Sequence, residues 1–213
     1  GSPSVNPQKK GKNLFNSAYF LNDGKIVSIH HKALLPNYDV FDEYRYFEPA
    51  KKLSIIEYKG VKIALTICED IWDIGNDRMY TYWPMEELIG QKPDLMINIA
   101  ASPFDYAHAE VRKEVMSANA KKYKLPLFYV NHVGSQTELI FDGGSMVADA
   151  KGNIIDELKY FEEEIKMYKV QCTKYEVSIQ KTEDRRQKTE TKIQRIHDSL
   201  VLGIRDYFRK MNF

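Results

Sequence analysis

Hydrophobic and polar residues alternate in two stretches of the first third of the chain, and each stretch predicts a β-hairpin. The first stretch covers residues 13–32 and turns at an Asn-Asp-Gly sequence at 22–24, which is typical of tight hairpin turns. The second stretch covers residues 53–67 and turns at a Lys-Gly pair at 59–60. Both patterns therefore indicate antiparallel strands early in the chain.

The middle of the chain alternates between strand and helix patterns. Compact apolar runs predict buried strands at 94–100 and 125–133, and apolar residues at helical spacing predict a helix over 105–124. Two further elements are predicted: a short helix over 83–92 that ends at Gly90, and a meander over 137–158 with turns at 143–144 and 151–152. This order predicts an α/β fold with helices outside a sheet core.

The composition of the chain changes from about Lys159. Residues 161–190 are dense in charge and predict a solvated linker, and residues 191–213 carry a helical pattern. The apolar positions of this last helix fall on one stripe: Ile193, Ile196, Leu200, Val201, Ile204, Tyr207, Phe208 and Met211. We expect the apolar stripe to pack against another surface.

Composition and charge exclude several classes of function. The 213 residues include 31 basic and 30 acidic side chains, a balance that gives no general affinity for nucleic acid or for anionic membranes. No run of about 18 apolar residues and no signal-peptide pattern occurs. Two distant cysteines form neither a disulfide framework nor a zinc-ligand pattern, so we expect a reducing, cytoplasmic setting.

Cys68 lies where the apolar run "KIALTI" meets the acidic "EDIWD". A thiol at a turn after a strand can attack a carbonyl carbon, with free backbone N–H groups beside it to hold the oxyanion. A lone cysteine at a strand end is more often core filler, and taken alone Cys68 favours that reading. A Cys–His pair would need His30, His31 or His132, and nothing in the sequence selects one of them.

The segment 30–47 places a lysine beside turn-forming residues and a cluster of acids and aromatic residues. On composition alone, Lys32 would be an ordinary surface lysine and Glu43 an ordinary surface acid.

Four blocks of the sequence, in this order, resemble the carbon–nitrogen hydrolase (nitrilase) superfamily. They are "HKALLPNYDVFDEYRYF", "GVKIALTICEDIWD", "NIAASPF" and "FDGGSMVADAKGNIIDE", and the likeness covers roughly residues 10–160. The first two blocks are specific to the glutaminase branch that occurs in glutamine-dependent NAD synthetases. The resemblance implies a nitrilase-type α-β-β-α sandwich, here partial because its N-terminal elements have no counterpart in the sequence.

In this family a Glu-Lys-Cys triad hydrolyses an amide, and two members of the triad can be matched here. By motif the nucleophile carries over to Cys68, and the lysine that stabilises the oxyanion and helps ammonia to leave carries over to Lys32. Glu43 matches a second acidic position that orients the site, and the backbone N–H of Glu69 would share the oxyanion hole with Lys32. Because a thiolate beside an ammonium has a lowered pKa, we expect Lys32 to lower the pKa of Cys68.

The resemblance also implies residues that bind the substrate, L-glutamine. Tyr38 and Ser102 match positions that hold glutamine, and His108 stands where the branch often has the Lys or Arg that contacts it. The family's general-base glutamate belongs to a "PEL" block ahead of the lysine, and no such block occurs in this sequence. We therefore expect the chain to be truncated at its front and to have little or no glutaminase activity by itself.

The resemblance further implies a division of the chain and a set of partners. Residues 1–160 would form the glutaminase domain, 161–190 a linker, and 191–213 a helix that enters an ATP-dependent synthetase domain. ATP, Mg²⁺ and deamido-NAD would bind in that synthetase domain, with no cofactor or metal in these residues. Pairing of superfamily members through helices near the site predicts a homo-oligomer. A stand-alone amidase and a non-catalytic interaction module are the alternative functions.

Overall fold

The structure is a computed structural model, and it describes residues 1–8, 10–75, 79–172, 177–181 and 191–212. The chain divides into two compact units, Gly1–Ile99 and Ala100–Phe213, and each is described by itself. The domain boundaries near residues 160 and 190 stay predictions.

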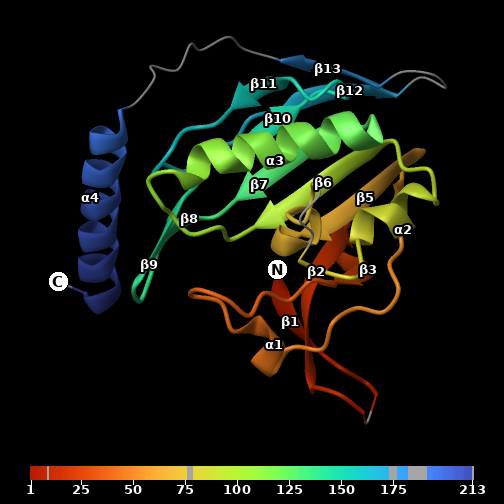
Figure 1. Cartoon of the computed structure of the whole chain (residues 1–213), viewed down its shortest axis with the longest axis horizontal. Helices are drawn as coiled ribbons and strands as arrows, with labels where there is room; N and C mark the ends of the chain where they lie inside the picture. Colours follow the sequence, from red (N-terminus) through yellow and green to blue (C-terminus); the bar gives the residue numbers. More distant parts are fainter. Residues whose placement is uncertain (9, 76–78, 173–176, 182–190, 213) are drawn as a thin grey trace. The chain divides into compact units, whose positions relative to one another are not determined.

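The first unit begins with an antiparallel sheet of three strands in the order β1-β2-β3 (Figure 1). These strands are β1 (Ser2–Val5), β2 (Leu14–Asn22) and β3 (Lys25–His31). Asp23 and Gly24 connect β2 to β3 with φ angles of 48° and 72°. Positive φ at both central residues is what a tight hairpin of this kind requires, so the first predicted hairpin and its turn are confirmed.

A second group of strands in this unit leads to Cys68. It consists of β4 (Ile56–Tyr58), β5 (Val61–Ile67) and β6 (Leu95–Ala100). Strand β4 pairs antiparallel with β5 across the predicted Lys59-Gly60 turn, whereas β5 pairs parallel with β6. Parallel strands bring their carboxyl ends to one edge of a sheet, and the chain leaves β5 at that edge.

Three short helices complete the first unit. They are α1 (Glu43–Tyr46), the 3₁₀ helix η1 (Cys68–Ile71) and α2 (Pro84–Ile89). Helix α2 packs on β5 and η1, with the side chains of Met85 and Leu88 almost fully buried. The predicted helix over 83–92 is confirmed, and it begins at Pro84. Proline suits this first position because its backbone has no N–H, and an N–H in the first turn would have no partner within the helix.

The second unit is built around helix α3, which packs on strands β7 and β10 (Figure 1). Its elements before residue 160 are α3 (His108–Tyr123), β7 (Leu127–Asn131), β8 (Val133–Gln136), β9 (Leu139–Asp142), β10 (Met146–Ala148) and β11 (Ile154–Glu157). Strand β10 pairs antiparallel with both β7 and β11, and β8 pairs with β9. The predicted helix and strand are present, whereas the predicted meander is only partly right: β10 and β11 pair across the turn at 151–152, but β9 pairs with β8 in a separate sheet from β10.

Two strands lie within residues 161–190, the segment predicted to be a linker. Strands β12 (Tyr168–Cys172) and β13 (Val177–Lys181) form an antiparallel hairpin. The rest of that segment includes residues 173–176 and 182–190, which lie outside the described residues. The linker interpretation therefore stays a prediction, with a hairpin in the middle of the segment.

Helix α4 (Lys192–Met211) confirms the predicted C-terminal helix. Thr191 caps it by accepting a hydrogen bond from the Gln194 N–H. The helix packs on β8 and β9, where Leu202 is 2% exposed and Asp206 accepts from the Ser135 N–H at 2.9 Å. None of the described helices is both long enough and apolar enough to span a membrane.

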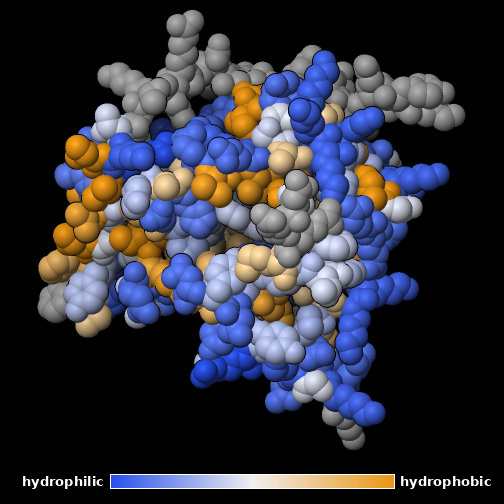
Figure 2. Space-filling model, viewed as in Figure 1, coloured by the Kyte–Doolittle hydropathy of each residue, from blue (hydrophilic) through white to orange (hydrophobic). Residues whose placement is uncertain are grey.

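The apolar stripe of α4 lies on the side that this packing leaves open. All eight of its side chains are between 43% and 80% exposed, and Figure 2 shows hydrophobic residues gathered over α4. Within the described residues this stripe is left uncovered, so the expectation that it packs against another surface stays a prediction. The helix is held instead by its opposite side.

Candidate functional site

Cys68 stands at the carboxyl end of β5, where the strand changes into the 3₁₀ helix η1. Its φ angle is +45°, a left-handed conformation that is uncommon for a residue with a Cβ atom. The residue keeps partial exposure, whereas Glu69 and Asp70 after it are buried. The sharp turn thus presents the thiol at the edge of the sheet while the following acids point inward.

Strand β6, the parallel neighbour of β5, supports this turn from the side. Asn98 is fully buried, and its side-chain amide donates to the Cys68 carbonyl at 3.3 Å and to the Thr66 hydroxyl at 3.0 Å. One bond holds the Cys68 backbone and the other holds the Thr66 side chain, so Asn98 helps to support the left-handed turn.

Lys32 and Glu43 form a close ion pair in the same unit. The Lys32 Nζ lies 2.5 Å from Glu43 Oε1, and Lys32 is only 1% exposed. Asn16 donates from Nδ2 to the other carboxylate oxygen of Glu43 at 3.1 Å. Composition alone indicates a surface lysine, and that interpretation is wrong because the ammonium is buried and paired. A buried lysine with a fixed partner is an arrangement suited to stabilising negative charge.

Glu69 carries a buried carboxylate next to the thiol. Its Oε1 accepts hydrogen bonds from the hydroxyl groups of Tyr38 at 2.8 Å and Tyr80 at 3.1 Å. Burial raises the pKa of Glu69, against the effect of these two phenols and of Lys32. The pKa values of both tyrosines are raised as well, first by burial and then by the carboxylate.

The thiol of Cys68 is protonated at neutral pH. Burial raises its pKa to about 11, and the neighbouring Lys32 ammonium lowers it by less than burial raises it. The expectation of a lowered pKa is therefore wrong in its net direction, although the effect assigned to Lys32 has the expected sign. A thiol of this kind needs a base, or the arrival of a substrate, before it can attack.

Ser102 and His108, the remaining predicted substrate residues, belong to the second unit. Ser102 is buried, and its backbone N–H donates to Asn131 Oδ1 at 2.9 Å. His108 is the first residue of α3, and its N–H donates to the Asp105 carbonyl. Their roles in binding glutamine stay predictions.

The histidines that a Cys–His pair would need have other partners. Ser17 is hydrogen bonded to His31 Nδ1 at 2.7 Å, and Ser28 to His30 Nε2 at 2.9 Å. His132 lies edge-on to the Phe141 ring in the second unit. Burial lowers the pKa of both His30 and His31. These contacts give the Cys–His alternative no support.

Sequence reasoning missed two residues that shape the site. Tyr80 shares Glu69 with Tyr38, and Asp70 binds three backbone N–H groups of the first unit. Tyr80 carried no sequence signal, because it reaches Glu69 from a loop that has no motif of its own. Asp70 could have been noticed as the acid two positions after the cysteine in "CED".

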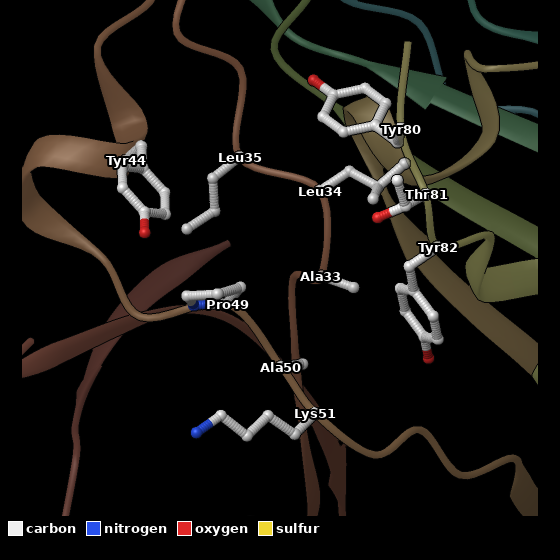
Figure 3. A pocket seen from close by; sticks show the side chains of 10 residues that line it. All are labelled: Ala33, Leu34, Leu35, Tyr44, Pro49, Ala50, Lys51, Tyr80, Thr81 and Tyr82. Carbon is white, nitrogen blue, oxygen red and sulfur yellow. The ribbon is translucent and has the colours of Figure 1, made fainter. Parts of the chain in front are cut away.

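A cavity of about 420 Å³ lies against the segment that follows Lys32. Figure 3 shows Tyr44 on one side of Leu34 and Leu35, with Tyr80 and Tyr82 on the other side. Most of its lining is aliphatic or aromatic, with Lys51 as the charged residue, and Cys68 does not line it. Such a lining does not suit the charged end of an amino acid.

The described part of the chain contains no group of three or more His, Cys, Asp or Glu side chains that could hold a metal ion.

Comparisons with known proteins agree on one family. A family model described as carbon-nitrogen hydrolase matches residues 2–177. To the glutamine-dependent NAD(+) synthetase of Synechocystis sp., the chain is 37% identical over 216 residues. This alignment covers 100% of this chain and 38% of that relative. The chain is 40% identical over 152 residues to the same enzyme of Thermotoga maritima, over 71% of this chain and 25% of the relative.

A solved structure gives the same result for the fold. The glutamine-dependent NAD+ synthetase of Acinetobacter baumannii, in complex with ADP, superposes with a TM-score of 0.84 and 31% identity. The match covers 99% of this chain and 38% of that one. The chain thus spans less than two fifths of the length of these three proteins.

Proposed function

Because the chain belongs to the carbon–nitrogen hydrolase family, we propose that it is the glutamine-hydrolysing part of a glutamine-dependent NAD synthetase. The observation that carries the proposal is the ion pair between the buried Lys32 and Glu43, in the same unit as the strand-end thiol of Cys68. The ammonium acts on the thiol, since it lowers the pKa of Cys68.

The proposed reaction replaces the amide nitrogen of glutamine by the sulfur of Cys68. The thiolate attacks the side-chain amide carbon, and the negative charge that develops on oxygen is stabilised by the Lys32 ammonium and the Glu69 N–H. The tetrahedral intermediate collapses as the C–N bond breaks, and the nitrogen leaves as ammonia after taking up the proton that the thiol gave up. Water then attacks the thioester, which releases glutamate and restores the thiol.

The proton transfers need a general base, and by motif no residue of this sequence fills that role. Glu43 is engaged with Lys32 and Asn16, and we assign it to orienting the ammonium. Tyr38, Ser102 and His108 are proposed to hold the amino-acid end of glutamine. The released ammonia would be used to amidate deamido-NAD in an ATP- and Mg²⁺-dependent step of the synthetase. A cytoplasmic, homo-oligomeric protein fits this function.

A glutamine-like electrophile should label Cys68 selectively. We expect a chloroketone analogue of glutamine to modify Cys68 faster than a chloroketone without the amino-acid end does, because the site is proposed to bind that end. Peptide mapping by mass spectrometry separates Cys68 from Cys172, which serves as an internal reference. Saturating glutamine should protect Cys68 and leave the modification of Cys172 unchanged. Equal labelling of the two cysteines would contradict the proposed function, and protection by simple aliphatic amides instead would favour a stand-alone amidase.

The isolated 213-residue chain should release glutamate from glutamine slowly. We expect a loss of at least about a hundredfold relative to an enzyme with its base in place, the usual contribution of general acid–base catalysis. Glutamate release by the chain is measured beside a Cys68→Ala control, which sets the background. Turnover at an ordinary enzyme rate would show that a residue of this chain serves as the base.

A further inference from the structure

One carboxylate of the first unit links the segment that carries Lys32 to the turn that carries Cys68. Asp70 lies in η1 and is 5% exposed. Its Oδ1 accepts hydrogen bonds from the N–H groups of Ala33 at 3.0 Å and Leu34 at 2.9 Å. Its Oδ2 accepts from the N–H of Ile67 at 3.0 Å. The two oxygens of one side chain therefore bind two segments that lie more than 30 positions apart in the sequence.

We propose that Asp70 is a positioning residue that fixes the backbone after Lys32 to the backbone before Cys68, and so sets the ammonium against the thiol. This inference rests on the proposed function, because it takes Lys32 and Cys68 as the reacting pair.

The bond to Ile67 bears on the conformation of Cys68. A hydrogen bond from the N–H of one residue to the side chain three positions later closes a tight turn around the residues between them. Cys68 is the first of these residues, and its φ of +45° is strained for a residue with a Cβ. Such a conformation persists only where its surroundings fix it, and Asp70 supplies part of that constraint.

The bonds to Ala33 and Leu34 bear on the position of Lys32. The Lys32 backbone is already held on both sides, since its N–H donates to the Asn16 carbonyl and its carbonyl accepts from the Ala50 N–H. Asp70 anchors the next two residues, so the chain cannot move away from Cys68 immediately after the lysine.

The cost of burying Asp70 supports a specific role for its charge. Burial raises its pKa to about 6, while the N–H groups of Leu34, Ile67 and Ala33 and the Lys32 ammonium act in the opposite direction. The group is thus ionised at neutral pH. Both oxygens then act as acceptors, which is the state that can bind two segments at once.

A double-mutant cycle between Asp70→Asn and Lys32→Met tests the positioning role. Asparagine has nearly the same shape but only one acceptor oxygen, so it can hold Ala33 and Leu34 or Ile67, but not both. The readout is the rate at which iodoacetamide modifies Cys68 at pH 9, measured by peptide mapping. The direct effect of the Asp70 charge on the thiol is present in both lysine backgrounds and cancels in the cycle.

We expect Lys32→Met to slow the reaction about tenfold or more when Asp70 is present. In the Asp70→Asn background, the factor by which Lys32→Met slows the reaction should be at least about threefold smaller. A lysine effect that is the same in both backgrounds, in variants with native circular dichroism, would overturn the proposal and leave Asp70 a purely structural residue. If Asp70→Asn does not fold, Asp70→Glu enters the same cycle, because its longer side chain keeps the charge and displaces the link. Iodoacetamide does not report glutamine binding, so the two proposals can fail separately. If the cycle is non-additive but the glutamine analogue labels without selectivity, the proposed function is rejected and the positioning role of Asp70 stands.

Discussion

Replacing Arg112 with methionine should lower the free energy of unfolding by about 3–5 kcal/mol, because it leaves the Asp142 carboxylate buried without its partner. Arg112 on α3 and Asp142 on β9 are 0% and 1% exposed. Two parallel hydrogen bonds join them, one of them at 2.7 Å from Nη1 to Oδ1. Urea unfolding followed by circular dichroism measures the loss, and a value under about 1 kcal/mol would show that the carboxylate finds water or another donor.

Two further variants separate the buried pair from the helix on which it lies. Glu110→Gln is the matched control, since Glu110 is on α3, is 67% exposed, and pairs with Lys113 at 3.3 Å. It should change stability by less than about 1 kcal/mol, as exposed ion pairs do. The double variant Arg112→Met with Asp142→Leu should be more stable than Arg112→Met alone, because no unpaired charge remains.

The elements that could be predicted from the sequence are those whose cause is local. The hairpin at 22–24 followed from Asp23 and Gly24, which take the positive φ angles that the turn requires. The helix over α4 followed from apolar spacing alone. The family and its nitrilase-type fold followed from four blocks of residues, and the match to residues 2–177 and the TM-score of 0.84 confirm both.

The features that could not be predicted depend on distant parts of the chain. Nothing near Lys32 indicates its burial or its ion pair with Glu43, whose carboxylate is held in turn by Asn16 from another segment. The side on which α4 packs within this chain could not be predicted either, because Leu202 and Asp206 hold the helix while its most apolar side stays exposed. Hydrophobic periodicity identifies a helix but does not say which contacts it makes.

The net pKa of Cys68 could not be read from the sequence for a related reason. The lysine that the resemblance places beside the thiol predicts a lowered pKa, whereas the depth of burial decides the balance and raises it. Depth of burial is a property of the packed turn as a whole, to which Asn98, Glu69 and Asp70 all contribute.

The reactivity of Cys68 should therefore rise steeply with pH in the alkaline range. With a pKa of about 11, roughly one thiol in a thousand is ionised at pH 8. Since the thiolate is the reactive form, the rate of modification by iodoacetamide should increase about tenfold for each pH unit between pH 7.5 and 9.5, about a hundredfold in all. Mass spectrometry of the Cys68 peptide measures the rate, and a plateau below pH 9 would show that the thiol is ionised far more readily than its burial implies.

Replacing Lys32 with methionine tests the cause of this behaviour. The ammonium lowers the pKa of the thiol and Glu43 raises it, so removing Lys32 leaves only effects that oppose ionisation. One pKa unit changes the thiolate population tenfold, and we expect the rate at pH 9 to fall by about that factor. Lys62→Met removes the same charge from a lysine on β5 that is 43% exposed and pairs with Glu57 at 3.6 Å, and it should leave the rate within about twofold because water screens its field. Equal effects of the two substitutions would mean that Lys32 acts only through the net charge of the protein. The proposal that its ammonium stabilises the oxyanion would then lose its electrostatic basis.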